Sequence, residues 1–153
     1  MSADARIAEL KLQLPAPQKP AGTYIPVVRV GNLIYVSGHG PLRADGTSIA
    51  GVVGGDLTEE QGKEAARAVG LCILSTLKHH LGSLDKIVRL IKVLGMVNAA
   101  PSFEHHPAVI NGFSDLMVEV FGEAGRGARS AVGMGSLPFR IAVEVEAIFE
   151  VRD

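Results

Sequence analysis

The segment that decides the fold reads Gly127-Ala128-Arg129-Ser130-Ala131-Val132, then Leu137-Pro138, then Val143-Glu144-Val145-Glu146-Ala147-Ile148. The last run alternates glutamates with aliphatic residues, which is the period of a β-strand with one buried face. The first run is also extended in character, and the Leu-Pro dipeptide between the two runs indicates a turn. The segment therefore predicts two strands that pair, one carrying an arginine and the other carrying carboxylates.

Arg129 and Glu144 are the first candidate site residues. In a hairpin centred on the Leu-Pro turn they would face each other within one pair spacing, about 5 Å. A guanidinium can clamp a small carboxylate bidentately, and a half-buried glutamate can be tuned into a general base, so the pair suits hydrolysis of a small organic acid. Spacing alone, however, favours an ordinary cross-strand salt bridge of little energetic value. Glu146 points to the same face as Glu144 and is an alternative base.

The composition limits the class of protein. The chain has 153 residues, of which 47% are hydrophobic, and its net charge at pH 7 is −1. This length fits one domain over residues 1–153, and the apolar excess favours burial between subunits. Lysines and arginines are scattered, so no basic face for a nucleic acid is expected.

The cysteine content and the distribution of apolar residues indicate where the protein is located. The single Cys72 excludes an intrachain disulfide and fits a reducing compartment. No apolar run approaches the roughly 20 residues of a membrane span, and the first residues lack the layout of a signal peptide. We therefore expect a cytoplasmic protein without membrane contact.

Hydrophobic periodicity predicts an α+β fold, in which one mixed β-sheet is covered by two helices. Thr58 and Gln61 have the spacing of a capping box and mark the start of one of these helices. Residues 1–21 are expected to form a short N-terminal helix and an extended linker. The glycine-rich segment Gly38–Gly55 is expected to form a loop, with room for a short strand at Ile49–Val53. The expected strands are Tyr24–Arg29, Leu33–Ser37, Ile87–Val97, Arg129–Met134 and Ile141–Val151, and the expected helices are Ala3–Leu12, Thr58 to about His80, and Pro107–Phe121.

Two further groups of residues have side chains that occur in functional sites. Ser37-Gly38-His39-Gly40 directly follows a strand, where glycines let the backbone approach a ligand, although an ordinary exit from a strand explains the same pattern. The adjacent histidine pairs lack the i,i+4 spacing of metal ligands, so no metal site is expected. Cys72 falls on the core face of a helix and is expected to be an inert thiol.

These residues resemble the RidA (YjgF) family, formerly also labelled endoribonuclease L-PSP, over nearly the whole chain after Gly22. The matching features are ordered, correctly spaced and spread over several elements. They are Gly22-Thr23-Tyr24, Gly31-Asn32, Ser37-Gly38, Asn111, Arg129-Ser130, Leu137-Pro138 and Val143-Glu144-Val145-Glu146-Ala147.

The resemblance implies a chorismate-mutase-like α+β protomer that assembles as a homotrimer, with ligand clefts between adjacent subunits. The activity it implies is hydrolysis of reactive 2-imino or 2-amino-enoic acids to 2-keto acids and ammonia, without a metal or an organic cofactor. By position, Arg129 would bind the substrate carboxylate and Glu144 would orient or deprotonate the attacking water. The cleft would be lined by Tyr24, Ser37, Gly38 and Asn111.

The chain also departs from the family pattern, which indicates a divergent, longer branch. Ala131 stands where the family usually has a cysteine, the loop Arg43–Gly55 is longer, and a helix precedes the fold. The side chain of the substrate is therefore left open. A trimer that binds a small carboxylate without turnover is the alternative function. Ribonuclease activity is a third, against which the near-neutral charge argues.

Overall fold

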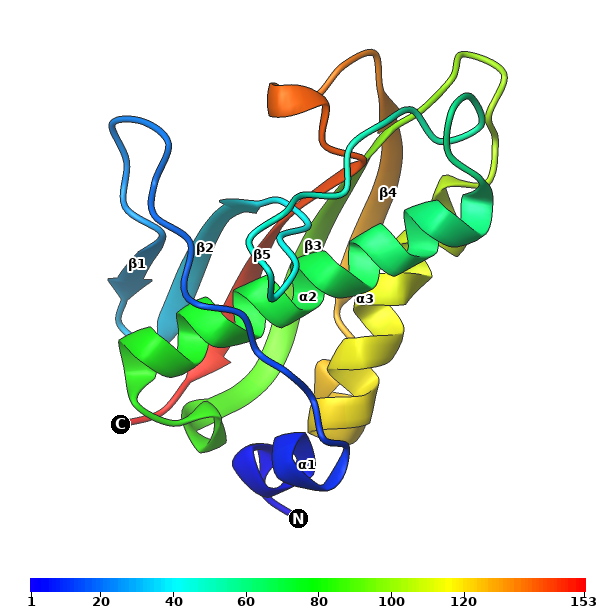
Figure 1. Cartoon of the computed structure of the whole chain (residues 1–153). Coiled ribbons are helices and arrows are strands. Elements are labelled where there is room, and N and C mark those ends of the chain that lie inside the picture. Colours follow the sequence, from blue (N-terminus) through cyan, green and yellow to red (C-terminus); the bar gives the residue numbers. More distant parts are fainter.

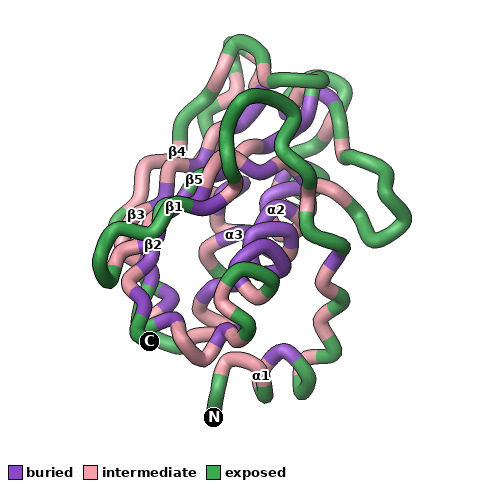
Figure 2. The backbone as a smooth tube through the Cα atoms, turned by 90° about the vertical axis from the view of Figure 1, so that its left-hand side faces the viewer, coloured by how far each residue is buried: buried purple, intermediate pink, exposed green.

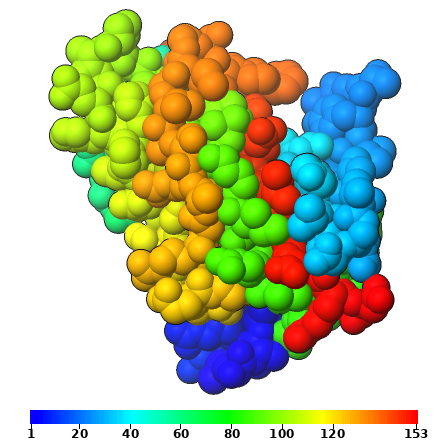
Figure 3. Space-filling model, turned by 180° about the vertical axis from the view of Figure 1, so that it is seen from behind, coloured from blue at the N-terminus to red at the C-terminus, as the bar shows by residue number.

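The computed structural model describes all 153 residues and confirms the α+β fold. Five strands form one mixed sheet in the order β1-β2-β5-β3-β4. Helices α2 and α3 cover one face of this sheet (Figure 1), and the view from behind shows that no helix covers the other face (Figure 3). The elements are α1 (Ala3–Glu9), β1 (Val27–Val30), β2 (Leu33–His39), α2 (Glu59–Leu81), β3 (Ile87–Asn98), α3 (His106–Phe121), β4 (Ala128–Met134) and β5 (Val143–Val151), with short 3₁₀ turns at Leu84–Lys86, Gly122–Gly125 and Pro138–Arg140.

Helix α2 begins at the predicted capping box. The Gln61 amide donates to Thr58 Oγ1 at 3.1 Å, and the Thr58 amide donates to Gln61 Oε1 at 2.8 Å. The helix ends at Gly82, whose left-handed φ of 82° favours glycine. The side chains on its inward face are buried, among them Ala65, Val69, Cys72, Ile73 and Leu77.

Helix α3 packs against α2 at very short range because of one glycine. A Cβ atom on Gly112 would lie 2.0 Å from the carbonyl oxygen of Lys63 in α2. The neighbouring inward side chains of α3, among them Ile110, Phe113 and Leu116, are fully buried between α2 and the sheet. Purple, buried segments in Figure 2 accordingly concentrate between the sheet and these two helices. This packing fixes the position of α3 relative to the sheet.

The first hairpin turns at Gly31-Asn32, and its first strand is shorter than predicted, since β1 begins at Val27 rather than at Tyr24. Val30 pairs with Leu33, and Gly31 has a φ of 60°, as a tight two-residue turn requires. No strand forms at Ile49–Val53, which makes only isolated bridges and therefore belongs to the loop.

The predicted hairpin between the last two strands is wrong. Strand β3 lies between them and pairs in parallel with β4 and antiparallel with β5. Arg129 is therefore opposite Val93, whereas Glu144 is opposite Met96. The physical reason is that residues 135–142 form a connection long enough to cross β3, whose apolar side chains favour a central place in the sheet.

The N-terminal segment packs outside this core. Ile7 of α1 is buried, and the linker after it crosses α2, where Ser75 Oγ donates to the carbonyl oxygen of Pro15 (Figure 1). None of the helices combines the length and the apolar character needed to span a membrane.

Replacing Gly112 with alanine should destabilise the fold by about 3 kcal/mol, because the added methyl group overlaps main-chain atoms of α2 that have little freedom to move. Gly135→Ala is the matched control, since no atom lies within 4 Å of the place that its new methyl group would take, and it should change stability by less than about 0.5 kcal/mol. Urea unfolding measures both. Equal stabilities of the two variants would contradict the close contact between α2 and α3.

Candidate functional site

The predicted site residues lie in two separate hollows of the chain. Tyr24, Ser37, Gly38 and Glu144 line the first, which has a volume of about 800 Å³ and is called here the Glu144 hollow. Asn111 and Arg129 line the second, which has a volume of about 550 Å³ and is called here the Arg129 hollow. Each chain therefore carries the predicted residues as two groups rather than as one site.

The Glu144 hollow depends on a bulge in β2. Val36 pairs with Ala147 and His39 pairs with Val145, so β2 has one extra residue between these two pairs. Bulges of this kind bend a strand and redirect its side chains, often next to active sites. Here the extra residue belongs to the Ser37-Gly38 stretch, directly beside β5.

Gly38 leaves the space that Glu144 occupies. A Cβ atom on Gly38 would lie 2.5 Å from Glu144 Oε2. Glu144 is half-buried, and this burial raises the pKa of its carboxyl above the usual value of a glutamate, with the charge of Glu146 as a second cause. A carboxylate with a raised pKa is suited to accept and return a proton.

Two further polar groups line the same hollow. Ser37 Oγ donates to the carbonyl oxygen of Ile25 at 2.7 Å, which leaves the hydroxyl oxygen free to accept a hydrogen bond. The Tyr24 hydroxyl accepts a hydrogen bond from the Ala21 amide at 3.2 Å, and 47% of Tyr24 remains exposed. The hollow therefore combines a tunable carboxylate with hydroxyl groups and an accessible aromatic ring.

The Arg129 hollow holds the guanidinium on neutral partners. Arg129 Nη1 donates to Asn111 Oδ1 at 2.8 Å and to Ser114 Oγ at 3.1 Å, both on α3. Arg129 forms no ion pair, whereas many other arginines of the chain do. The guanidinium is thus oriented without being neutralised, as a binding group for an anion must be.

Sequence reasoning missed Ser114. It lies three residues after Asn111, so both side chains occur on one face of α3. This i,i+3 spacing is the signal that a search for partners of the arginine would have used.

Within one chain, the arginine and the glutamate point to opposite sides of the sheet. Arg129 contacts α3 on the helix-covered side. Glu144 alternates with Val143 and Val145, which are fully buried on that side, so Glu144 points to the uncovered side. The alternative of a cross-strand salt bridge is therefore excluded for this pair.

His39 and Cys72 have structural surroundings. His39 is buried, with Nδ1 2.6 Å from the Ser37 carbonyl oxygen and Nε2 2.9 Å from Thr76 Oγ1, and burial lowers its pKa. The neutral ring therefore links β2 to α2. Burial also raises the pKa of Cys72, as expected for an inert thiol. The structure brings together no three His, Cys, Asp or Glu side chains that could hold a metal ion.

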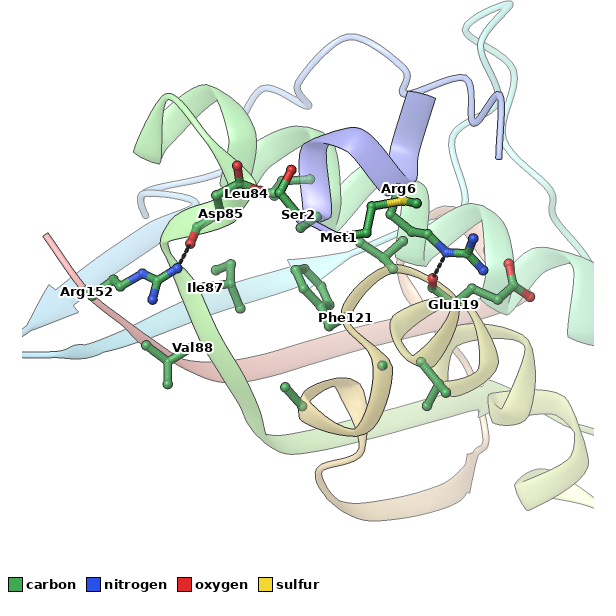
Figure 4. Close-up of a pocket in the computed structure, with 15 residues that line it drawn as sticks. Met1, Ser2, Arg6, Leu84, Asp85, Ile87, Val88, Glu119, Phe121 and Arg152 are labelled. Carbon is green, nitrogen blue, oxygen red and sulfur yellow. Dashed lines mark hydrogen bonds between the residues drawn. The ribbon is translucent and has the colours of Figure 1, made fainter. Parts of the chain in front are cut away.

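A third hollow, of about 630 Å³, lies between α1, the start of β3 and the end of α3 (Figure 4). Arg6 and Arg152 lie at its opposite sides, and each donates to a main-chain carbonyl, those of Glu119 at 2.9 Å and Asp85 at 2.8 Å. None of the predicted site residues lies there. These arginines stabilise the docking of chain segments, so the hollow is not the candidate site.

Comparison with known proteins places this architecture in a family. Residues 4–149 match the family model described as "YjgF/chorismate_mutase-like, putative endoribonuclease". Protein TCP17 of Trypanosoma cruzi is 42% identical over 150 residues, which are 97% of this chain and 94% of that protein.

Solved structures share the fold. The crystal structure of Atu1372 from Agrobacterium tumefaciens, a protein of unknown function, is 41% identical with a TM-score of 0.90, covering 98% of this chain and 92% of that chain. RidA from the Antarctic bacterium Psychrobacter sp. PAMC 21119 is 26% identical with a TM-score of 0.63, covering 91% and 96% respectively. The match in sequence and fold extends over nearly the whole chain. The chain therefore belongs to the YjgF/chorismate mutase-like family, the RidA family that its sequence resembles.

Proposed function

We propose that this protein hydrolyses small 2-imino or 2-amino-enoic acids to 2-keto acids and ammonia without a cofactor. The observation that carries the proposal is Glu144, a half-buried carboxylate with a raised pKa that faces the space left by Gly38. A base of this kind matches the reaction, because a protonated imine carbon is already electrophilic and needs mainly a positioned water. Arg129, held by neutral groups, is the matching clamp for the substrate carboxylate.

The active assembly in this proposal is a homotrimer in which Arg129 of one subunit completes the Glu144 hollow of the next. Two features support it. Strand β4, which carries Arg129, is at the edge of the sheet. The uncovered sheet face carries exposed apolar side chains, including Val28 at 46%, Tyr35 at 44% and Val132 at 37% exposure, which favour burial against another subunit.

The reaction balances with one carboxylate. Glu144 takes a proton from water as the water oxygen bonds to the imine carbon, which forms a carbinolamine. The protonated Glu144 returns this proton to the amine nitrogen. The carbon–nitrogen bond then breaks while the hydroxyl proton passes back to Glu144, and this proton leaves with the ammonia as ammonium. The raised pKa of Glu144 suits both directions of transfer.

The rival functions differ in what they need from the same groups. A binding trimer would need Arg129 but would not need Glu144 as a base, and it would bind 2-keto acids without turnover. Ribonuclease activity would need contacts to several phosphates, which a chain of net charge −1 with scattered basic residues does not favour. The raised pKa of Glu144 favours the hydrolase.

The pH dependence should identify the base. Glu144 must be ionised to act, so kcat/KM should rise as the pH passes upward through its raised pKa. Glu146→Gln removes one of the charges that raise this pKa, so the acidic limb of the profile should move to lower pH. Glu144→Gln should instead lower kcat/KM by about a hundredfold or more at every pH. If Glu146→Gln abolished turnover while Glu144→Gln retained it, Glu146 would be the base.

Mixing two inactive variants should show that the site is shared between chains. Subunits with Arg129→Ala keep Glu144, and subunits with Glu144→Gln keep Arg129. A mixed trimer therefore contains an intact site wherever these two kinds of subunit meet in the right order. An intact site needs Arg129 from one subunit and Glu144 from its neighbour, and in an equimolar mixture each of these is present with a frequency of about one half. Such mixtures should therefore recover about a quarter of wild-type turnover. The assay is suppression of semicarbazone formation from 2-iminopropionate generated by an amino-acid oxidase.

Arg126→Ala is the matched control, because Arg126 lines the same hollow as Arg129 but pairs with Glu123 at 3.4 Å. It should retain turnover. Mixtures that stay inactive would contradict a shared site. A wild-type protein that accelerates hydrolysis of no 2-imino acid would contradict the proposed reaction itself.

A further inference from the structure

The turn before β5 exposes a large apolar side chain at the Glu144 hollow. Phe139 is 83% exposed and lines this hollow together with Glu144 and Tyr24. In Figure 3 the orange segment that contains this turn and the blue segment that contains Tyr24 stand on two sides of the hollow. A single exposed apolar side chain is ordinary on a protein surface, but this one stands in the wall of the candidate site, where a ligand would contact it.

The backbone of this turn is strained. Phe139 has φ 56° and ψ 20°, and Arg140 has φ 55°, so two consecutive residues with side chains adopt the left-handed conformation. Residues other than glycine adopt it rarely, and it persists only where the surroundings impose it. Such strain clusters at ligand sites, where it holds a group in a fixed place.

The long loop that distinguishes this chain holds the turn by hydrogen bonds. The Gly51 amide donates to the carbonyl oxygen of Arg140 at 2.9 Å, and the Ala142 amide donates to that of Ile49 at 3.0 Å. Arg140 Nη2 also lies 3.4 Å from Asp56 Oδ2. The turn is thus held on both its backbone and its side chain by the loop, while within one chain the side chain of Phe139 stays exposed.

We propose that Phe139 is a specificity-determining residue that selects 2-imino acids with a bulky apolar side chain, such as those derived from leucine or phenylalanine. This proposal rests on the proposed function and names its substrate class. The reacting end of the ligand lies at Glu144, and its side chain lies between the rings of Phe139 and Tyr24, with Ile141 also lining this region. An aromatic wall on each side of a side chain gains contact area at little conformational cost.

The rival proposal is a preference for imino acids with an acidic side chain, because Lys19 lines the same hollow and could pair with it. Wild-type kcat/KM is therefore compared for imines derived from alanine, leucine and glutamate by oxidases of matching specificity. The leucine-derived imine should be preferred over the alanine-derived one by about tenfold or more. A preference for the glutamate-derived imine would overturn the proposal.

Phe139→Ala should lower the leucine-to-alanine ratio of kcat/KM by about tenfold, whereas Phe139→Leu, which keeps an apolar wall, should lower it by less than about threefold. Thermal unfolding and the oligomeric state of both variants are measured alongside and should match the wild type, so that a loss of selectivity does not reflect loss of the fold or of the assembly. A ratio that Phe139→Ala leaves unchanged would overturn the proposal.

A binding measurement separates this inference from the proposed reaction. Calorimetry compares 4-methyl-2-oxopentanoate with pyruvate on the wild type and on Phe139→Ala. If no imine is hydrolysed, the hydrolase proposal fails, but a wild-type preference for the larger keto acid that disappears in Phe139→Ala still supports the apolar wall. The proposal for Phe139 is overturned if wild type and Phe139→Ala prefer the larger keto acid equally, or if the wild type does not bind it.

Discussion

The position of β3 between β4 and β5 is the constraint on which the candidate site depends. Because β3 pairs with both strands, Arg129 lies at the edge of the sheet and Glu144 lies inside it. The arginine points to the side of α3, and the glutamate points to the uncovered side. Each chain thus keeps the two groups of candidate site residues apart, and the proposed trimer would bring them together.

Close packing, rather than charge pairing, positions the side chains of each group. Gly112 lets α3 approach α2, and α3 carries the Asn111 and Ser114 side chains that orient the guanidinium of Arg129. On the other side, the bulge in β2 and the missing side chain of Gly38 make room for the Glu144 carboxylate. Both groups remain free of ion pairs, and this leaves their charges available to a ligand.

Many helices and strands could be predicted because interactions between residues close in sequence determine them. The capping box at Thr58, the turn at Gly31-Asn32 and the hydrophobic spacing of the helices indicated the correct elements. The strand order was not predictable by the same means, since neighbouring runs suggest a hairpin and only the tertiary packing of β3 excludes one. The bulge beside Gly38 depends on a register between distant strands. The strained turn at Phe139 lacks glycine, and its hydrogen-bond partners lie in a loop about ninety residues earlier in the chain.

The most direct test of a site shared between chains is a crystal structure of the protein with pyruvate bound. The account predicts a trimer in which the carboxylate of pyruvate contacts Arg129 of one subunit while its carbonyl carbon faces Glu144 of the adjacent subunit. The turn that carries Phe139 should lie beside the methyl group of the ligand. Pyruvate bound to Arg129 with no Glu144 from any subunit near its carbonyl carbon would contradict the account.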